Sequence, residues 1–396
     1  MSTRNAVPFA RKLLVPTVVY TMFVGGLFLA CFQFSLYYMA EEYGFGSTVM
    51  GLLTSVQFAF MILFTIPLGK LADKIGNKKV YLFQSVCTTV GCLLLWSRLG
   101  GMAGILLGVF LGGAGYGLLA LLSTTVVTEA FPENSGRYVS LACVGFSAGS
   151  LLGPVGARPI AAATHWSTPF LIVAVLGFIG LLMVAASEFY RSSSIPAKAE
   201  EKLPLSQIIR TPGLALIGLG IIVYLGIETA TGSFMEAYFS ETVGAGPLSA
   251  LALSLYWGMM FPTRLAISAY KGTKYPVILV CIALSAAAFV AATLMPTQAA
   301  KMVCFALVGL FIGPVYPIMM GTGSSSIPGH TGTVTGFLST CFGIGAGLIP
   351  PVIGRLIALL GYPTTMVMMA VLTALLFILY HTAVATMKKN GRTQGL

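Results

Sequence analysis

Charged residues are scarce in this chain. Only 8% of its 396 residues are charged, whereas an ordinary soluble domain carries about 25%. A soluble fold with so little charge could not cover its surface with polar groups. Hydrophobic residues make up 57% of the chain, and the mean hydropathy is +0.92. The composition therefore excludes an ordinary soluble protein and indicates a membrane protein.

Motifs for catalysis are also missing. Aspartate occurs once, as Asp73, among only 11 acidic residues. The sequence contains no Walker loop, HExxH, GxSxG or Ser/His/Asp arrangement. The three histidines (His165, His330 and His381) lie in a loop or at the edges of apolar runs. We therefore expect neither ATP hydrolysis nor covalent catalysis. We also expect that the protein is not an enzyme and uses no cofactor.

Metal-binding patterns are missing as well. All seven cysteines fall inside apolar runs, and none forms a CxxC motif or a Cys/His pair. Isolated cysteines of this kind pack as small apolar side chains. We expect neither a metal site nor a disulfide.

Long apolar runs are what the chain does contain. A helix needs about 20 apolar residues to cross a bilayer, and about twelve runs approach or exceed that length. This pattern predicts an all-α membrane protein with 12 transmembrane helices. The runs lie near 13–40, 47–69, 79–97, 102–128, 137–161, 167–189, 212–239, 247–270, 275–295, 300–322, 332–357 and 364–386.

Basic residues are distributed unevenly around these runs. If the N-terminus is cytoplasmic, 18 of the 22 Lys and Arg residues fall on the inner side, Arg137 and Arg264 among them; the four exceptions are Arg98, Arg158, Lys301 and Arg355. The positive-inside rule then places both termini in the cytoplasm. Cations at that surface contact anionic headgroups. The net charge of +11 therefore indicates contact with the bilayer and not with nucleic acid.

One long polar stretch, residues 190–211, divides the runs into six and six. We interpret it as a cytoplasmic linker between two six-helix bundles, residues 1–189 and 212–396. Paired halves around a central site are the usual plan of secondary transporters.

A single acidic residue lies in the middle of an apolar run. Glu228 is at the centre of the seventh run, where a charged and unpaired carboxylate costs several kcal/mol. It should therefore be protonated or have a partner, and it is the best candidate for a proton-coupling residue; the alternative is a permanently neutral acid with a structural hydrogen bond. Glu236, two turns further out, is interpreted mainly as a solvated charge at a helix end and secondarily as a second proton-coupling residue.

Other polar and aromatic side chains lie at mid-membrane depth. Gln33 and Tyr37 are four residues apart and share a helix face, as do Tyr224 and Glu228. Amides offer donors and acceptors, and Tyr and Trp add flat faces with one polar atom. This mixture suits a small polar solute, although each residue alone could instead bond a neighbouring helix. The predicted solute-binding residues are Gln33, Tyr37, Gln57, Tyr224, Tyr256, Trp257 and Tyr316.

The segment from Gly69 to Lys79 reads GKLADKIGNKK, and we predict a tight cytoplasmic loop there. It resembles the G-x-L-A-D-[RK]-x-G-[RK]-[RK] loop of the major facilitator superfamily, with Asn77 where a basic residue is usual. The resemblance implies that Asp73 caps the helix that begins near Thr331 and so latches the two halves together. The residues expected at this conformational gate are Gly69, Asp73, Gly76, Lys78, Glu129 and Arg137.

Within that superfamily two patterns compete. Residues 224–239 and the run Gly313-Pro314-Val315-Tyr316-Pro317 resemble the fucose permease-like sugar:proton symporters, which implies that Glu228 is their acidic residue. Gly145, Gly149 and Gly153 partly resemble the fifth-span motif of drug:proton antiporters. The membrane arginine expected in the fourth span of those exporters is absent, so uptake is favoured over efflux.

The expected function is therefore proton-coupled uptake of a sugar or related metabolite by alternating access. A proton-coupled antiporter that exports drugs or metabolites is one alternative, and an uncoupled membrane sensor or lipid flippase is another. We expect a monomeric, multi-pass protein of a prokaryotic inner membrane whose partners are the solute and the lipid bilayer.

Overall fold

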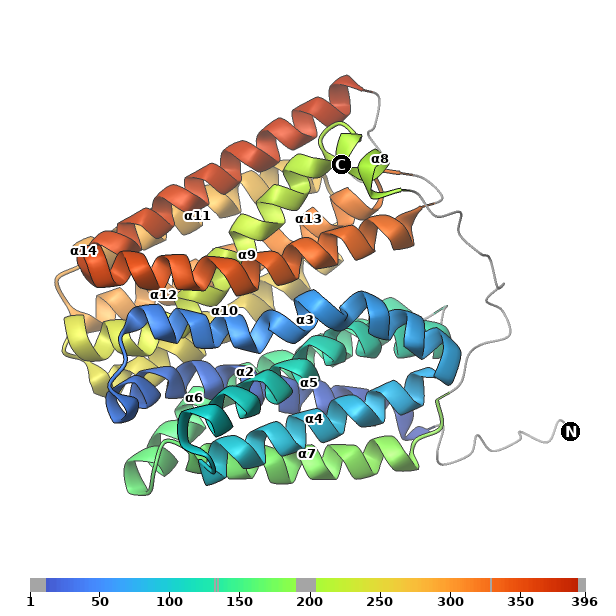
Figure 1. The fold of residues 1–396 in the computed structure, drawn as a ribbon. Helices are drawn as coiled ribbons and strands as arrows, with labels where there is room; N and C mark the ends of the chain where they lie inside the picture. Colours follow the sequence, from blue (N-terminus) through green and yellow to red (C-terminus); the bar gives the residue numbers. More distant parts are fainter. Residues whose placement is uncertain (1–11, 132, 134, 190–203, 328–329, 391–396) are drawn as a thin grey trace, which may run out of the picture. The chain divides into compact units, whose positions relative to one another are not determined.

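The computed structural model describes residues 12–131, 133, 135–189, 204–327 and 330–390, and within these ranges it contains helices and no strand. Figure 1 shows the helices in chain order. They are α2 (Leu14–Tyr43), α3 (Ser47–Ile75), α4 (Asn77–Ser97), α5 (Gly101–Ala130), α6 (Ser135–Ala163), α7 (Thr168–Ala186), α8 (Leu205–Arg210), α9 (Leu214–Ala237), the π-helical turn η2 (Tyr238–Thr242), α10 (Gly246–Ala269), α11 (Lys274–Leu294), α12 (Gln298–Ile312), α13 (Val315–Ser324) and α14 (Thr331–Lys389).

Ten helical stretches of the described residues are long and apolar enough to cross a membrane. One of them contains α12 and α13, and another contains most of α14. The all-helical membrane class predicted from the composition is confirmed. The helix breaks, by contrast, differ in places from the predicted loops.

The segment predicted as a loop at residues 69–79 is largely helical. Helix α3 continues to Ile75 and α4 begins at Asn77, so only Gly76 separates them. Gly76 has φ 92°, in the left-handed region that favours glycine. The prediction of a loop was wrong because charged residues beyond the apolar run do not prevent a helix from continuing into the headgroup layer.

A similar single-residue break lies within α14. Its helical pattern continues from Thr331 to Lys389, except at Gly361, where φ is 77°. The predicted runs 332–357 and 364–386 lie on either side of this kink. In the preceding stretch α12 and α13 are separate helices within what the sequence indicated as one span, 300–322.

Contacts divide the chain into two compact units. The first contains Met1–Phe32 and Ala59–Ala197, and the second contains Gln33–Phe58 and Lys198–Leu396. Helices α2 and α3 are thus each divided between units. The predicted bundle boundaries at 1–189 and 212–396 remain a prediction.

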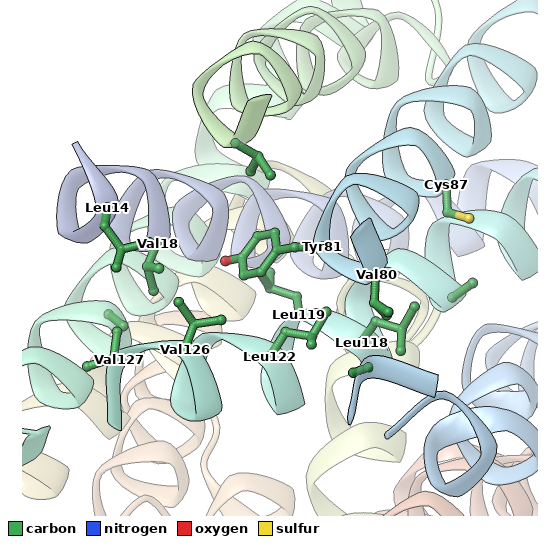
Figure 2. Close-up of a cluster of buried hydrophobic side chains, with 14 of the residues drawn as sticks. Leu14, Val18, Val80, Tyr81, Cys87, Leu118, Leu119, Leu122, Val126 and Val127 are labelled. Carbon is green, nitrogen blue, oxygen red and sulfur yellow. The ribbon is translucent and has the colours of Figure 1, made fainter. Parts of the chain in front are cut away.

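In the first unit, α4 packs against α5 and α7. Figure 2 shows the buried cluster that joins them, including Tyr81 of α4 and Leu118, Leu119 and Leu122 of α5. The Tyr81 hydroxyl lies 2.7 Å from Oγ1 of Thr21, so the polar end of this large side chain is satisfied inside an apolar core.

In the second unit, α9 packs against α14 and α10, while α11 packs against α12 and α14. Of the ten candidate spans, the one that contains α9 has the largest buried share, 78%. Most of its side chains, Glu228 included, are enclosed by protein and not by lipid. Polar groups on α9 must therefore find their partners within the unit.

Candidate functional site

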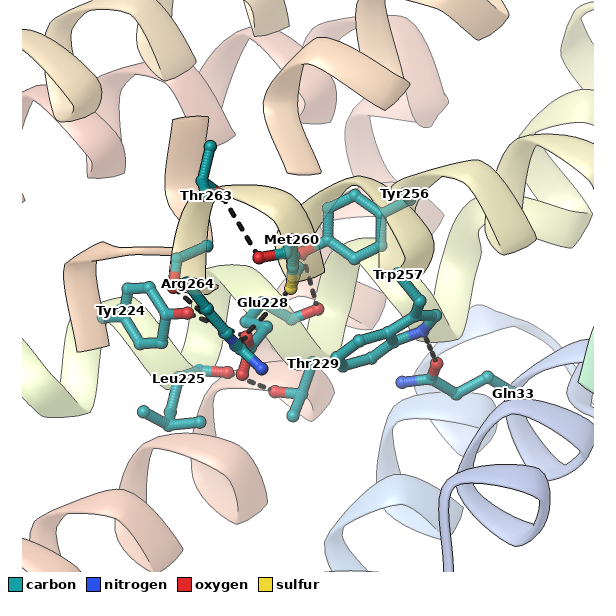
Figure 3. Close-up of polar contacts among 11 residues, drawn as sticks. Gln33, Tyr224, Leu225, Glu228, Thr229, Tyr256, Trp257, Met260, Thr263 and Arg264 are labelled. Atoms are coloured by element: carbon teal, nitrogen blue, oxygen red, sulfur yellow. Dashed lines mark hydrogen bonds and ion pairs between the residues drawn. The ribbon is translucent and has the colours of Figure 1, made fainter. Parts of the chain in front are cut away.

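Glu228 is buried in the second unit and paired with an arginine. Its side chain is 8% exposed, and its Oε1 lies 3.0 Å from Nη2 of Arg264 on α10. The same oxygen accepts a hydrogen bond from the Tyr224 hydroxyl at 2.8 Å. Figure 3 shows these two donors converging on the carboxylate. The buried acid therefore has the partner that its depth required.

A helix break fixes the position of Arg264. Its Nε donates to the carbonyl oxygen of Gly313 at 3.0 Å. In a regular helix that carbonyl would accept from the backbone nitrogen four residues on, but this residue is Pro317, which has no N–H. Arg264 thus satisfies a carbonyl that the proline leaves open, and the guanidinium is held between this carbonyl and Glu228.

Two more of the predicted solute-binding aromatics surround the ion pair. The Tyr256 hydroxyl donates to the backbone oxygen of Glu228 at 3.2 Å. The Tyr316 ring stacks on the Tyr224 ring, with 6.0 Å between centroids and 19° between planes. Tyr224, Tyr256 and Tyr316 therefore gather around Glu228, and the Tyr224 hydroxyl is already used by the carboxylate. Their role in solute binding stays a prediction.

The amide of Gln33 lies against α9 and α10. Trp257 Nε1 donates to Gln33 Oε1 at 2.8 Å, a bond drawn in Figure 3. Gly232 makes room for this amide, since a Cβ there would lie 2.5 Å from both Oε1 and Nε2 of Gln33. Gln33 is fully buried, and its Nε2 has no hydrogen-bond partner among the described residues.

Gln57 is a second buried amide in this unit. Thr54, one turn earlier on α3, donates to Oγ of Ser233 on α9 at 3.1 Å. Gln57 is fully buried, and neither atom of its amide finds a partner within the part of the chain that the structure describes. An unpaired buried polar group costs about 1–3 kcal/mol. Gln33 and Gln57 therefore hold unused hydrogen-bonding capacity inside the unit that contains Glu228.

Comparison with known proteins decides the family. The family model described as Major Facilitator Superfamily matches residues 18–350 and 269–395. The chain belongs to the Major Facilitator Superfamily.

Known proteins are similar along three quarters of the chain or more. The membrane protein MosC of Rhizobium meliloti is 23% identical, over 89% of this chain and 85% of that protein. A candidate glucose/galactose transporter of Helicobacter pylori is 24% identical, over 76% of this chain and 78% of that protein. The crystal structure of the E. coli fucose:proton symporter FucP has a TM-score of 0.64 at 20% identity, covering 94% and 97% of the two chains.

The Major Facilitator signature segment is held to its neighbours by two side chains. Lys78 Nζ donates to the carbonyl oxygens of Ala185 and Ser187 at 2.7 and 2.9 Å. These carbonyls lie at the end of α7, where no further turn of helix supplies a backbone donor. Asn77 Nδ2 donates to Glu129 Oε2 at 2.7 Å. Asn77, which departs from the family pattern, therefore has a defined contact that the sequence did not reveal.

Of the predicted gate residues Gly69, Asp73 and Arg137, only Arg137 has a described side-chain environment. Arg137 is exposed at the start of α6. Gly69 and Asp73 belong to α3, but their side-chain environment lies outside the described residues. The expected contact between Asp73 and the helix near Thr331 therefore stays a prediction.

Glu236 does not fit the solvated helix-end interpretation. It is fully buried, and its Oε1 accepts from the Tyr38 hydroxyl at 3.0 Å and from Ser249 Oγ at 2.6 Å. The interpretation was wrong because Tyr38 and Ser249 come from other helices, which the position of Glu236 near a helix end does not reveal.

Tyr37 lies in a different environment from Gln33. Its hydroxyl donates to Glu41 at 2.6 Å on an exposed part of α2, whereas Gln33 is fully buried. The role of Tyr37 in solute binding stays a prediction.

Arg264 is a candidate site residue that sequence reasoning missed. It lies five residues before the end of α10 and was counted among the inner surface charges. Two features could have pointed to it: it is the only basic residue of α10, and an acid at the depth of Glu228 needs a cation.

Proposed function

We propose that the protein is a secondary active transporter that moves a small polar organic solute by alternating access and couples this movement to protons. In this proposal 12 spans form two six-helix bundles in a prokaryotic inner membrane, with both termini in the cytoplasm. Family membership supports transport, and one observation supports coupling: the Glu228 carboxylate is buried and paired with Arg264 at 3.0 Å. Ionisable residues inside a membrane are usually functional.

The ion pair can link a proton to a solute. Removing one charge from a buried pair leaves the other charge without compensation. A proton that binds Glu228 neutralises its carboxylate and so releases the Arg264 guanidinium for another acceptor. Arg264 is 28% exposed, against 8% for Glu228, so the released donor is the more accessible partner. A solute oxygen that accepts from Arg264 would then stabilise the protonated state.

The buried amides support a neutral, hydroxyl-bearing solute. Because Trp257 donates to Gln33 Oε1, the remaining atom of that amide, Nε2, can only donate. The Gln57 amide can both donate and accept. A hydroxyl group provides both complementary functions, whereas an ionised carboxylate can only accept and an ammonium group can only donate. The names of FucP and of the Helicobacter relative agree with a sugar or related metabolite.

Glu236 provides a second carboxyl on α9. It lies eight residues beyond Glu228, which is a rise of about 12 Å along the helix. Its two hydroxyl donors, Tyr38 and Ser249, suit either protonation state because hydroxyls can donate or accept. We assign Glu236 a supporting role in proton transfer between Glu228 and the outer side.

The signature segment serves as the conformational gate in this proposal. The single-residue turn at Gly76 joins α3 and α4, and Asn77 and Lys78 tie that turn to α5 and α7. Movement of α3 would therefore be transmitted to three neighbouring helices through side chains within one turn of Gly76.

The test is transport by the purified protein in liposomes, with L-fucose, D-galactose and D-glucose as probes. We expect an outside-acid pH gradient to drive accumulation of one probe by the wild type. Glu228→Gln should abolish that accumulation but retain exchange of labelled for unlabelled solute, while Glu133→Gln, a change at an exposed acid, should behave as wild type. Unchanged gradient-driven accumulation in Glu228→Gln would refute the coupling role.

The same assay separates the alternatives. Accumulation driven only by an inside-acid gradient would indicate the antiporter. No transport of any probe with either gradient would favour the uncoupled membrane sensor or lipid flippase.

A further inference from the structure

An apolar groove lies between α2 and α6 of the first unit. Its cavity volume is about 540 Å³, within the range of about 300–1,000 Å³ for small-molecule sites. Its wall is almost entirely apolar, and the residues that define its length are Val15, Val19, Phe23, Leu141, Val144 and Ala148. A groove with such a wall suits a hydrocarbon chain and not a polar solute.

Glycines fix how the two helices lie along this groove. A Cβ at Gly145 would collide with the carbonyl oxygen of Val19, and one turn later a Cβ at Gly149 would collide with that of Phe23. Both pairs are 126 positions apart (145 − 19 and 149 − 23). The helices therefore run in the same direction in constant register, with their backbones in close contact.

That register brings two cations to the same end of the groove. Lys12 and Arg137 are 125 positions apart (137 − 12), so they lie at the same level, one turn before the groove begins at Val15 and Leu141. Both side chains are exposed. Arg137 precedes Leu141, Val144 and Ala148 by four, seven and eleven positions on α6, which keeps it on the groove face. Lys12 lies two residues before α2 begins at Leu14, at the same end of the groove.

The arrangement is therefore amphipathic along its length. Two cations mark one end, and the apolar wall extends from Val15 to Phe23, a rise of about 12 Å. The positive-inside rule places the charged end at the cytoplasmic surface, where anionic lipid headgroups lie. A free anion would use the cations but not the groove, and a neutral lipid would use the groove but not the cations.

We propose that this groove binds a phospholipid with an anionic headgroup, with the headgroup between Lys12 and Arg137 and one acyl chain along the groove. The occupant is a lipid and not another protein segment. The cations are complementary to an anionic headgroup, and the apolar wall next to them is complementary to an acyl chain. The groove shares no residue with the proposed solute site, so it can be tested whether or not the protein transports protons.

Native mass spectrometry of the full-length protein in detergent tests this site, with dioleoyl phosphatidylglycerol and dioleoyl phosphatidylcholine as probes. We expect the wild type to prefer phosphatidylglycerol by about fivefold for each cation that contacts the headgroup. The double variant K12Q/R137Q should lose this preference. K271Q/K274Q, which removes two exposed charges from the second unit, should keep it. Equal binding of both lipids by the wild type, or equal loss in the control variant, would overturn the proposal.

Two further measurements test the acyl chain separately. Ala148→Phe fills the groove and keeps both cations, so it should reduce phosphatidylglycerol binding to the level of K12Q/R137Q; unchanged binding would show that the groove is not used. Glycerol 3-phosphate has an anionic group and no acyl chain, and it should not displace the lipid. Displacement at equal concentration would identify a free-anion site and contradict the lipid assignment.

Discussion

Arg264 and Glu228 are 36 positions apart in the sequence, yet Nη2 of the arginine lies 3.0 Å from Oε1 of the glutamate. The arginine is also held by the carbonyl of Gly313, which Pro317 leaves without its usual helical donor. Acceptors from α9 and from the end of α12 therefore both bond to one guanidinium on α10. A proton or a solute that breaks the Arg264–Glu228 contact would therefore alter the packing contacts among these three helices.

The ion pair should show energetic coupling. Arg264→Gln leaves Glu228 without its cation, which costs about 3–5 kcal/mol in a fully buried pair and less here because Arg264 is 28% exposed. The double variant Glu228→Gln/Arg264→Gln removes both charges and should be less destabilised than the sum of the single variants. Thermal unfolding of the purified variants measures this, and strictly additive losses would show that the two charges do not interact.

Gln57→Leu should make the protein more stable and less functional. The leucine replaces a buried amide that lacks partners, and removing that unpaired group should gain about 1–3 kcal/mol. It also removes the donor and acceptor proposed for the solute. We expect a higher unfolding temperature without solute and a smaller temperature shift on adding the sugar that stabilises the wild type. A destabilised variant with an unchanged temperature shift on adding sugar would contradict both the predicted gain in stability and the predicted loss of solute binding.

Gly232→Ala should displace the Gln33 amide. The added Cβ would lie 2.5 Å from both polar atoms of that amide, and the amide can rotate away only by breaking its bond to Trp257. Solute affinity should fall while the Glu228–Arg264 pair is retained. Gly321→Ala is the matched control, since it adds a Cβ to a helical glycine with nothing within 4 Å. Equal solute affinity in both variants would exclude a role for the Gln33 amide.

Gly76→Ala should strain the turn between α3 and α4. Gly76 has φ 92° and open space around it, so the cost is that of the backbone alone, about 1–2 kcal/mol. Gly156→Ala, at a helical glycine of α6 that is also exposed and in open space, should not be destabilising. Chemical unfolding compares the two, and equal stability would mean that the turn relaxes without cost.

Some of these features follow from sequence alone. The depth of Glu228 in an apolar run indicated a buried acid that needs a partner, and polar residues such as Gln33 and Trp257 stood out for the same reason. The helical membrane class followed from the scarcity of charge. These inferences succeed because any polar group inside the bilayer must find its partner within the protein.

Other features depend on how distant segments meet. Arg264 was taken for a surface charge because its distance from a helix end indicates the interface, and only the pairing of α9 with α10 reveals its contact. Glu236 was taken for a solvated residue, although Tyr38 and Ser249 cover it. The register of α2 and α6, which aligns Lys12 with Arg137, likewise depends on glycine contacts that no local pattern in the sequence predicts.

Proton movement measured directly during solute transport tests the central claim. A pH-sensitive dye sealed inside liposomes reports the lumen while the sugar that stabilises the wild type is added outside. We predict that the wild type acidifies the lumen as the sugar enters, and that Glu228→Gln admits the sugar down its gradient without acidification. Acidification by Glu228→Gln with the wild-type ratio of protons to sugar would contradict the account.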